Sequence, residues 1–225
     1  MVNLRCPVCA GALEKRAGAY LCPKNHSFDI AKSGYVNLLL NSSQGHHGDD
    51  KLMVRARRDF LDKGYYDRFI AAVADAAAEL TPPEATVLDA GCGEGYYTAG
   101  LWEALGRPPL AGIDLSKPSV RLAARRVPEG EFAVASVYPL PVADGVAELL
   151  VDCFSPLALT EFWRVLKPGG WFLYVVPGAR HLWELKQVLY DRPYPNEEKQ
   201  TPYPGFAYRA IREVDFTAHL PDPQT

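Results

Sequence analysis

Apolar residues follow two different spacings along most of the chain. From Asp50 onward, two segments carry them three and four positions apart: KLMVRARRDFLDKG, ending near Gly64, and YDRFIAAVADAAAEL, ending before Pro82. This spacing predicts two amphipathic helices. Short apolar runs then predict strands at ATVLDAG, PLAGIDLS, EFAVAS, VAELLVDCF and GWFLYVV, with helical segments such as SVRLAARRV and LTEFWRVLK between them. The alternation predicts an α/β fold with a mostly parallel sheet covered on both faces.

The first forty residues have a different character. Cys, His and Gly interrupt short β-rich pieces such as AYLC and SGYVNLLL. Residues 41–49, NSSQGHHGD, are polar and Gly-rich and predict a linker or loop. We therefore expect a small module at 1–40, a linker at 41–49 and an α/β domain at 50–225. A chain of 225 residues is long enough for one full domain and a small module.

Composition and charge narrow the class of protein. The chain is 48% hydrophobic and 23% charged, as in ordinary globular proteins. No apolar run approaches the length of a membrane span, and the N-terminus does not resemble a signal peptide, so we expect a cytoplasmic protein without membrane contact. Residues 1–68 carry 11 Lys and Arg against 7 Asp and Glu, whereas residues 69–225 carry 13 against 20. This asymmetry favours contact with a polyanion at one end, and chance unevenness is the alternative.

Three cysteines and one histidine in the first zone have the spacing of metal ligands. They are Cys6, Cys9, Cys22 and His26, in the pattern C-x2-C-x12-C-x3-H. Forty residues bury little core, so a metal crosslink would explain how this segment folds. We predict one structural zinc ion, because four protein ligands leave no open position for chemistry. A redox-active pair of Cys6 and Cys9 is the alternative.

The first predicted strand of the α/β domain runs into a Gly-rich turn, VLDAGCGEG. Gly91 and Gly93 allow the backbone to turn sharply and to approach a ligand closely. Asp114 ends the next strand, where a carboxylate accepts hydrogen bonds from ribose hydroxyls. The spacing G-x-G-x-G after the acidic Asp89 differs from the G-x-G-x-x-G of NAD and FAD enzymes. It resembles motif I of class I, Rossmann-like methyltransferases, and RVLKPGGWF resembles the loop before their fifth strand.

This resemblance implies S-adenosylmethionine as the cofactor. Ser136, just after the third strand, lies where this fold usually meets the adenine, and a plain surface serine is the alternative reading. Because class I methyltransferases act on many substrates, the fold does not name one.

Further stretches are more specific. They are C-P-x-C, CPKNHSFDIAKSGYVNLL, ARRDFLDKGYY, GCGEGYYT and P-G-x-R-H-L-x-E-L-K. Together they resemble the RlmA/TlrB family of bacterial enzymes, which methylate N1 of a guanine in one hairpin of large-subunit ribosomal RNA. The resemblance covers essentially the whole chain, and it implies an rRNA (guanine-N1)-methyltransferase whose partner is large-subunit ribosomal RNA.

The resemblance also assigns residues. The four zinc ligands match the family's ligands, and Tyr66, Gly93, Glu94 and His181 match positions that contact the cofactor. From the residues alone, Tyr66 reads as a core aromatic and His181 as a histidine at a helix start. Family members continue past the end of this chain with a helix and two strands, so we expect the methyltransferase domain to be C-terminally incomplete.

The sequence does not identify a catalytic residue. Guanine N1 must lose a proton before it attacks the methyl group, and Asp152, after the fourth strand, is a candidate for the base. Phe154 either stacks on an extruded guanine or packs in the core. Arg55 and Arg58 either face RNA or belong to a solvated helix face. The rival functions are a small-molecule methyltransferase and a non-catalytic zinc-containing RNA-binding factor, and formation of a homodimer is left open.

Overall fold

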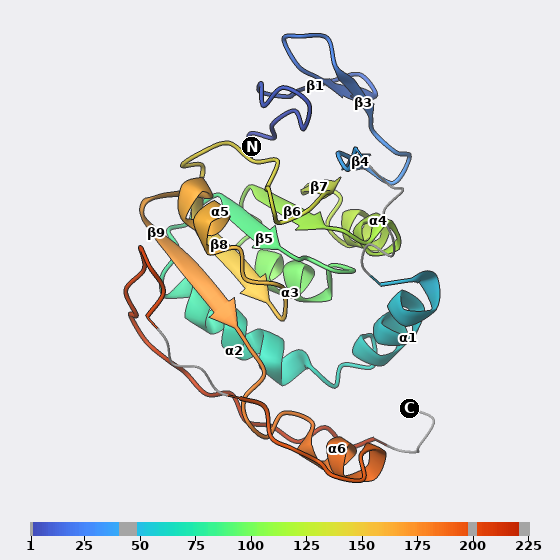
Figure 1. Ribbon diagram of the computed structural model, residues 1–225, viewed down its shortest axis with the longest axis vertical. Helices are drawn as coiled ribbons and strands as arrows, with labels where there is room; N and C mark the ends of the chain where they lie inside the picture. The colour runs from blue at the N-terminus through green and yellow to red at the C-terminus, as the bar shows by residue number, and fades with distance from the viewer. Residues whose placement is uncertain (1, 41–48, 198–201, 221–225) are drawn as a thin grey trace.

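The computed structural model describes residues 2–40, 49–197 and 202–220. At the N-terminus, three short strands form an antiparallel sheet in the order β1-β2-β3 (Figure 1). The strands are β1 (Glu14–Arg16), β2 (Ala19–Leu21) and β3 (Ser27–Asp29). This small sheet stands at one end of a larger, helix-covered sheet (Figure 1).

The larger sheet has six strands in the order β4-β7-β6-β5-β8-β9, and every neighbouring pair is parallel. Its strands are β4 (Tyr35–Asn37), β5 (Val87–Ala90), β6 (Leu110–Asp114), β7 (Glu131–Val134), β8 (Ala147–Cys153) and β9 (Leu166–Val175). The predicted parallel α/β sheet is therefore confirmed. From β5 the chain builds outward on one side through β6 and β7, and then on the other side through β8 and β9. In such open sheets, ligands bind outside the carboxyl ends of the strands at this switch point.

Six helices accompany the strands in the described part of the chain. They are α1 (Lys51–Leu61), α2 (Asp67–Ala78), α3 (Tyr96–Ala104), α4 (Lys117–Arg126), α5 (Leu159–Val165) and α6 (Trp183–Leu189). Helix α1 begins where the Asp50 side chain accepts hydrogen bonds from the backbone N–H groups of Leu52 and Met53. Ser116 caps α4 in the same manner through the N–H of Ser119. Both helices predicted between Asp50 and Pro82 are present.

Alternating strand residues divide the core between the two faces of the large sheet. Val87 and Leu149 pack with residues of α2, α3 and α4, whereas Leu88 and Leu150 pack with Phe162 of α5. All five side chains are fully buried. Because both faces are covered, the central strands read as continuous apolar runs in the sequence.

The piece SGYVNLLL leaves the N-terminal zone and joins the large sheet. Tyr35 and Val36 of β4 pair in parallel with Phe132 and Ala133 of β7, so β4 forms one edge of the sheet. The N–H of Leu38 continues the pairing by donating to the carbonyl of Val134, at 2.9 Å. Residues 41–48, which make up almost all of the predicted linker, lie outside the described residues.

The zone before β4 rests on residues 139–144 of the larger domain. The N–H of Arg5 donates to the carbonyl of Pro141, and the N–H of Ala143 donates to the carbonyl of Asn3, each at 2.8 Å. Leu4 is 1% exposed and lies in the same hydrophobic cluster as Val142. The small module is therefore continuous with one half of the core.

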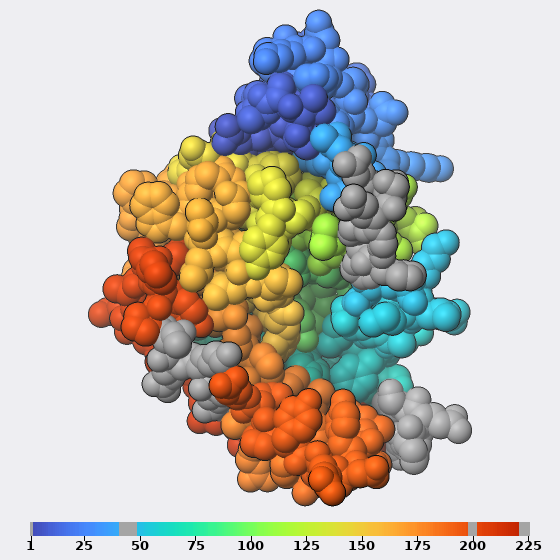
Figure 2. Space-filling model, in the orientation of Figure 1, coloured from blue at the N-terminus to red at the C-terminus, as the bar shows by residue number. Residues whose placement is uncertain are grey.

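The chain beyond β9 runs over the outside of the molecule, where α6 and the segment after it form the orange and red surface of Figure 2. No residue of α6 is buried. Arg212 ties the later segment to α2 through an ion pair with Glu79, 3.0 Å from Nη1 to Oε1. Among the described residues, no helix is both long and apolar enough to cross a membrane.

Candidate active site and metal centre

The four predicted zinc ligands converge in the N-terminal module. Their ligand atoms all lie within 4.8 Å of one another. The His26 Nδ1 atom is 3.2 Å from the Cys22 sulfur and 3.4 Å from the Cys6 sulfur, and the Cys9 and Cys22 sulfurs are 3.6 Å apart. Zn–S bonds of about 2.3 Å and Zn–N bonds of about 2.0 Å in a tetrahedron separate the ligands by roughly 3.5–3.8 Å. The cluster therefore fits one tetrahedral zinc ion.

Backbone geometry and hydrogen bonding prepare the cluster for a metal. Each pair of ligands sits on a tight turn, in which the N–H of Ala10 donates to the Cys6 carbonyl and the N–H of Asn25 donates to the Cys22 carbonyl. Burial raises the pKa of the Cys22 thiol, but hydrogen bonds outweigh burial and lower the pKa to about 6; they come from backbone N–H groups, with that of His26 first, and from the side chains of Cys9 and His26. The thiolate is the form that binds metals. With all four groups drawn together, a redox role for Cys6 and Cys9 alone is the weaker interpretation.

The Gly-rich turn after β5 leaves one open position. Gly91 has a φ of +90°, and a Cβ there would lie 2.1 Å from the Ser155 hydroxyl; a Cβ on Gly95 would lie 2.6 Å from the Ala123 Cα. By contrast, a Cβ on Gly93, whose φ is +54°, would meet nothing within 4 Å. The glycines on either side are thus required by packing within the protein. Gly93 borders the open space that a ligand would enter.

Asp114 lies directly beside this turn. Its Oδ2 accepts the N–H of Gly93 at 3.0 Å, and its Oδ1 accepts the N–H of Ser116 at 2.7 Å. Burial raises the pKa of its carboxyl, and these two N–H groups partly oppose that rise. Each carboxylate oxygen can accept a further hydrogen bond. The carboxylate is therefore fixed in place with the capacity to bind the two hydroxyls of a ribose.

Glu94 is held by a residue that sequence reasoning missed. Its side chain is 3% exposed, and its Oε2 accepts hydrogen bonds from Arg126 Nη2 at 2.8 Å and Nε at 3.2 Å. Arg126 also binds Asp62, just after α1, at 2.6 Å. The guanidinium of Arg126 therefore links α4, the Gly-rich turn after β5 and the end of α1. An arginine in the last turn of a helix is common, so nothing in the local sequence marked it.

Four buried side-chain oxygens in this region have no hydrogen-bond partner among the described residues. They are Asp89 Oδ1, Glu94 Oε1, Asp152 Oδ2 and Ser155 Oγ. Burial raises the pKa of Asp89 and of Asp152 to about 7 each. Unpaired buried acceptors are costly and are rare in proteins. S-adenosylmethionine carries an ammonium and a sulfonium, so these oxygens, which lie in β5 and β8 or in the turns that follow them, fit a cationic polar ligand.

Two predicted cofactor residues, Tyr66 and His181, meet at an aromatic cluster. The Tyr66 hydroxyl is 3.3 Å from His181 Nε2. The His181 ring stacks on Phe154 with 5.7 Å between centroids and 24° between planes, and Phe154 stacks on Phe69 at 5.5 Å and 21°. Phe154 remains 39% exposed and has a φ of +60°, an unusual conformation for a bulky residue. Phe154 thus packs on aromatic neighbours and still presents part of its ring to solvent.

Within the described residues, Ser136 makes no hydrogen bond to any of the other predicted cofactor residues. Its hydroxyl donates to the Tyr138 carbonyl at 3.0 Å and accepts the Tyr138 N–H at 2.8 Å. Both bonds are local and stabilise the turn after β7. A contact between Ser136 and the adenine stays a prediction.

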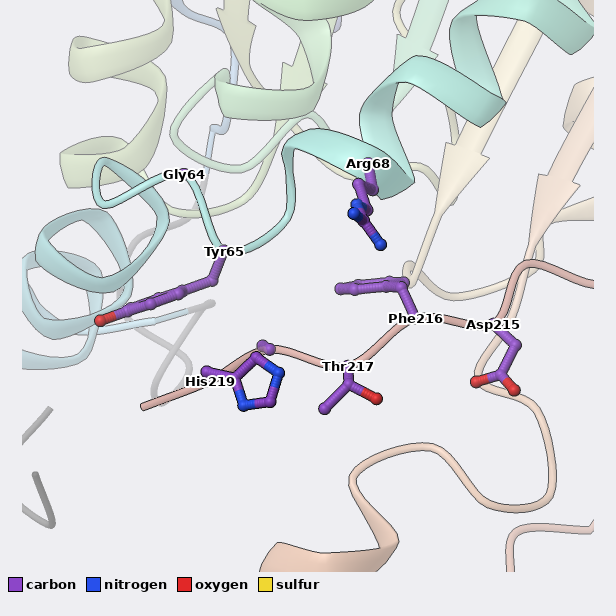
Figure 3. Close-up of a pocket in the computed structure, with 8 residues that line it drawn as sticks. Gly64, Tyr65, Arg68, Asp215, Phe216, Thr217 and His219 are labelled. Atoms are coloured by element: carbon purple, nitrogen blue, oxygen red, sulfur yellow. The ribbon is translucent and has the colours of Figure 1, made fainter. Parts of the chain in front are cut away.

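A pocket of about 560 Å³ lies beside the aromatic cluster (Figure 3). Figure 3 shows Arg68 of α2 on one side of Phe216, with His219 and Tyr65 farther along the same opening. Phe216 also packs edge-on against Tyr66, with ring centroids 5.4 Å apart. Phe216 therefore separates the pocket from Tyr66, and the Gly-rich turn does not line the pocket.

The sheet order, the Gly-rich turn and the placement of Asp114 define the class of protein, a class I S-adenosylmethionine-dependent methyltransferase with an N-terminal zinc module. Two family models agree with this class of protein. Residues 4–41 match the N-terminal zinc ribbon of RlmA, and residues 87–170 match a methyltransferase domain.

Sequence relatives place the chain in one family. A Micromonospora griseorubida protein assigned as a 23S rRNA (guanine-N(1)-)-methyltransferase is 41% identical over 83% of this chain and 70% of its own length. The 23S rRNA (guanine(748)-N(1))-methyltransferase of Streptomyces fradiae is 39% identical over 83% of this chain and 67% of its own length. YxjB of Bacillus subtilis, with a similar assignment, is 34% identical over 84% and 70%. The chain belongs to the family of 23S rRNA (guanine-N1)-methyltransferases.

Proposed function

We propose that this protein transfers a methyl group from S-adenosylmethionine to N1 of a guanine in a large-subunit ribosomal RNA hairpin. The proposal rests on family membership together with the geometry of the Gly-rich turn after β5, which leaves room for the cofactor. Gly93 borders open space, and Asp114 is anchored beside it. Bound S-adenosylmethionine would supply an electrophilic methyl group. An enzyme acting on ribosomal RNA would work in the cytoplasm.

The protein's own residues would mainly position the two reactants, because alignment of the reactants can lower much of the activation barrier of such a transfer. We assign cofactor binding to the predicted set, in which Asp114 takes the ribose hydroxyls and the turn at Gly91 and Gly93 admits the backbone of the ligand. Tyr66 and His181 would close the site from the side of α2, since their side chains lie 3.3 Å apart there.

The substrate guanine would enter at the end of β8. A paired guanine must leave its helix to reach the methyl group, and aromatic side chains stabilise an extruded base by stacking. The partly exposed ring of Phe154 lies at this end of the sheet, as does the buried carboxylate of Asp152. Asp152 is the side chain here that would accept the N1 proton, and Ser155 orients it by donating its backbone N–H to Oδ1 at 3.0 Å.

The N-terminal module at 1–40 would recognise RNA, and residues 50–225 would carry out methyl transfer. This division is compatible with the contribution of β4 to the large sheet, because that strand fixes the orientation of the module on the catalytic domain. Sedimentation of the purified protein would decide whether it works as a homodimer.

Primer extension on ribosomal RNA tests the proposal, because a methyl group on guanine N1 blocks reverse transcription. RNA from cells that lack the protein should be copied through the target guanine, and incubation with the purified protein and cofactor should create a stop. A small-molecule methyltransferase would bind the cofactor and leave this RNA unmodified while methylating a member of a small-molecule panel. A non-catalytic RNA-binding factor would bind the RNA and transfer no labelled methyl group to any substrate.

A further inference from the structure

A second pocket, which the Gly-rich turn does not line, lies between the N-terminal module and α4. Its volume is about 560 Å³, and its lining consists of Lys32, Ser33, Arg121, Ala124, Arg125 and Pro128. Three of these six residues are cationic and none is acidic. Lys32 comes from the turn between β3 and β4, whereas the two arginines come from one face of α4. The pocket thus joins basic groups of both parts of the molecule.

These three cations have no ion-pair partner among the described residues. Each side chain is exposed, and no carboxylate of the described residues lies within 4.0 Å of any of their charged groups. Arg126, the next residue of α4, makes the contrast, because it binds both Glu94 and Asp62. A cation in the last turn of a helix is favourable through the helix dipole, which explains Arg125. The dipole explains neither Arg121, a full turn earlier, nor Lys32 on another element.

The arginines of α1, which the sequence marked as a candidate RNA surface, are engaged differently. Arg55 and Arg58 both pair with Asp59, at 3.5 and 2.8 Å, and Arg57 pairs with Asp49. Each of these arginines therefore has an acidic partner, which Arg55 and Arg58 share. The pocket on α4 has no such compensation and concentrates positive charge where the domains meet.

We propose that this basic pocket binds successive phosphates of the ribosomal RNA backbone, about one for each cation, and so carries the RNA from the zinc module across α4 toward the catalytic end of the sheet. The inference rests on the proposed function. Convergent arginines and lysines without acids suit a phosphodiester, since such contacts supply most of the sequence-independent affinity for nucleic acid.

The position of α4 supports this path. Helix α4 lies between β4 and α1 (Figure 1) and contacts both. Ser116, at its N-terminus, donates its hydroxyl to the Asp49 carbonyl at 2.8 Å, and Arg126, at its C-terminus, reaches Asp62 after α1. In this proposal, a strand of RNA that touches both the module and the cofactor end passes along this helix.

Filter binding of protein-free large-subunit ribosomal RNA, taken from cells that lack the protein, tests the proposal. The double variant Arg121→Gln/Arg125→Gln of the full chain should lose affinity by roughly tenfold at about 0.15 M salt, and the slope of log affinity against log salt should fall by about 1.4. Lys32→Gln alone should lose about fourfold, with a change in slope of about 0.7. The matched control, Arg192→Gln/Arg209→Gln, removes the same charge from the C-terminal segment and should retain the wild-type slope.

Zinc content and the affinity for S-adenosylmethionine should be unchanged in all variants, which excludes misfolding as the cause. Equal RNA affinity and an equal salt slope in the Arg121/Arg125 variant and the wild type would overturn the proposal. A defect seen with ribosomal particles but not with naked RNA would also overturn it and would assign the pocket to an acidic protein. Methylation is scored separately by primer extension, so an RNA that binds through this pocket but is never methylated would contradict the proposed function and leave the pocket assigned.

Discussion

The N-terminal module and the catalytic domain are held together by different forces. The module has three-residue strands, and its interior is organised around Cys6, Cys9, Cys22 and His26. The catalytic domain buries complete apolar strands on both faces of a parallel sheet. It also buries several polar or charged side chains, namely Asp89, Glu94, Thr98, Ser116, Ser119 and Asp152, whereas no such side chain outside the ligand set is buried in residues 2–34.

The difference shows what each kind of stabilisation permits. Zinc binding to structural sites contributes on the order of 10 kcal/mol, so a module with little core can fold around one ion. A large hydrophobic core stabilises a domain enough to tolerate unpaired carboxylates next to its ligand site. In the N-terminal module, stability is therefore concentrated at the metal. In the catalytic domain, it is distributed over the core, so the ligand site can keep unpaired carboxylates.

Removal of the metal should have the largest effect. Cys22→Ser should abolish stoichiometric zinc binding and disorder residues 2–34, because the module has little core of its own to replace the ion. Zinc analysis and amide hydrogen exchange check this outcome. Cys153→Ser, which changes a buried cysteine of the catalytic domain, should retain zinc. A double Cys6→Ser/Cys22→Ser variant that still holds one zinc ion per chain would contradict the assignment of the ligands.

Obstruction of the cofactor turn should have the next largest effect. Gly93→Val should abolish binding of S-adenosylmethionine, because its side chain would occupy the open space. Gly145→Val is the matched control, since Gly145 has a φ of +59° and also has nothing within 4 Å of its Cβ position. Both changes carry a similar strain of about 1–2 kcal/mol. Calorimetric titration should show cofactor binding in the second variant alone, and binding in both would place the cofactor elsewhere.

A smaller effect is expected from Asp114. Asp114→Ala should weaken S-adenosylmethionine binding by about 1–3 kcal/mol, or roughly 5- to 150-fold, because it removes the acceptor for the ribose and frees two backbone N–H groups. Asp114→Asn retains one acceptor oxygen and should bind with intermediate affinity. Zinc binding should not change in either variant. An affinity equal to that of the wild type in both would refute a ribose contact.

The smallest effect concerns the buried charge of the catalytic domain. Burial raises the pKa of Asp152 to about 7, so the folded protein holds a proton that the unfolded chain releases near pH 4. The associated stability is present below about pH 4 and is lost as the pH rises through 7. Asp152→Asn should therefore raise the free energy of unfolding by about 1 kcal/mol or more at pH 8 and change it little near pH 4.

Urea denaturation at the two pH values checks this prediction, with the paired carboxylate variant Asp144→Asn as a control that should show no such gain. The same Asp152 variant separates a structural from a catalytic role. If Asp152 accepts the N1 proton, the methylation rate of the wild type should decrease at pH values below about 7, because the carboxylate becomes protonated there. Full activity of Asp152→Asn with an unaltered pH profile would leave this carboxylate without a part in proton transfer.

Local patterns in the sequence predicted much of this structure. The spacing of three cysteines and one histidine predicted a metal cluster, because ligands on tight turns are specified within a few residues. The alternation of apolar strands and amphipathic helices predicted the parallel sheet, and the turn at Gly91 and Gly93 predicted where the cofactor would lie. SGYVNLLL was recognised as β-rich, but its partner β7 could not be read from the segment itself.

Contacts between distant residues were decided only by the tertiary structure. The pairing of Tyr66 with His181 spans 115 positions, and that of Glu94 with Arg126 spans 32. The basic pocket arises because β4 docks Lys32 next to α4, which no spacing along the chain reveals. Periodicity and turn chemistry are properties of neighbouring residues, so the sequence determined the elements and the metal ligands. Which side chains share a site depends on how those elements pack, and packing is settled by the whole core at once.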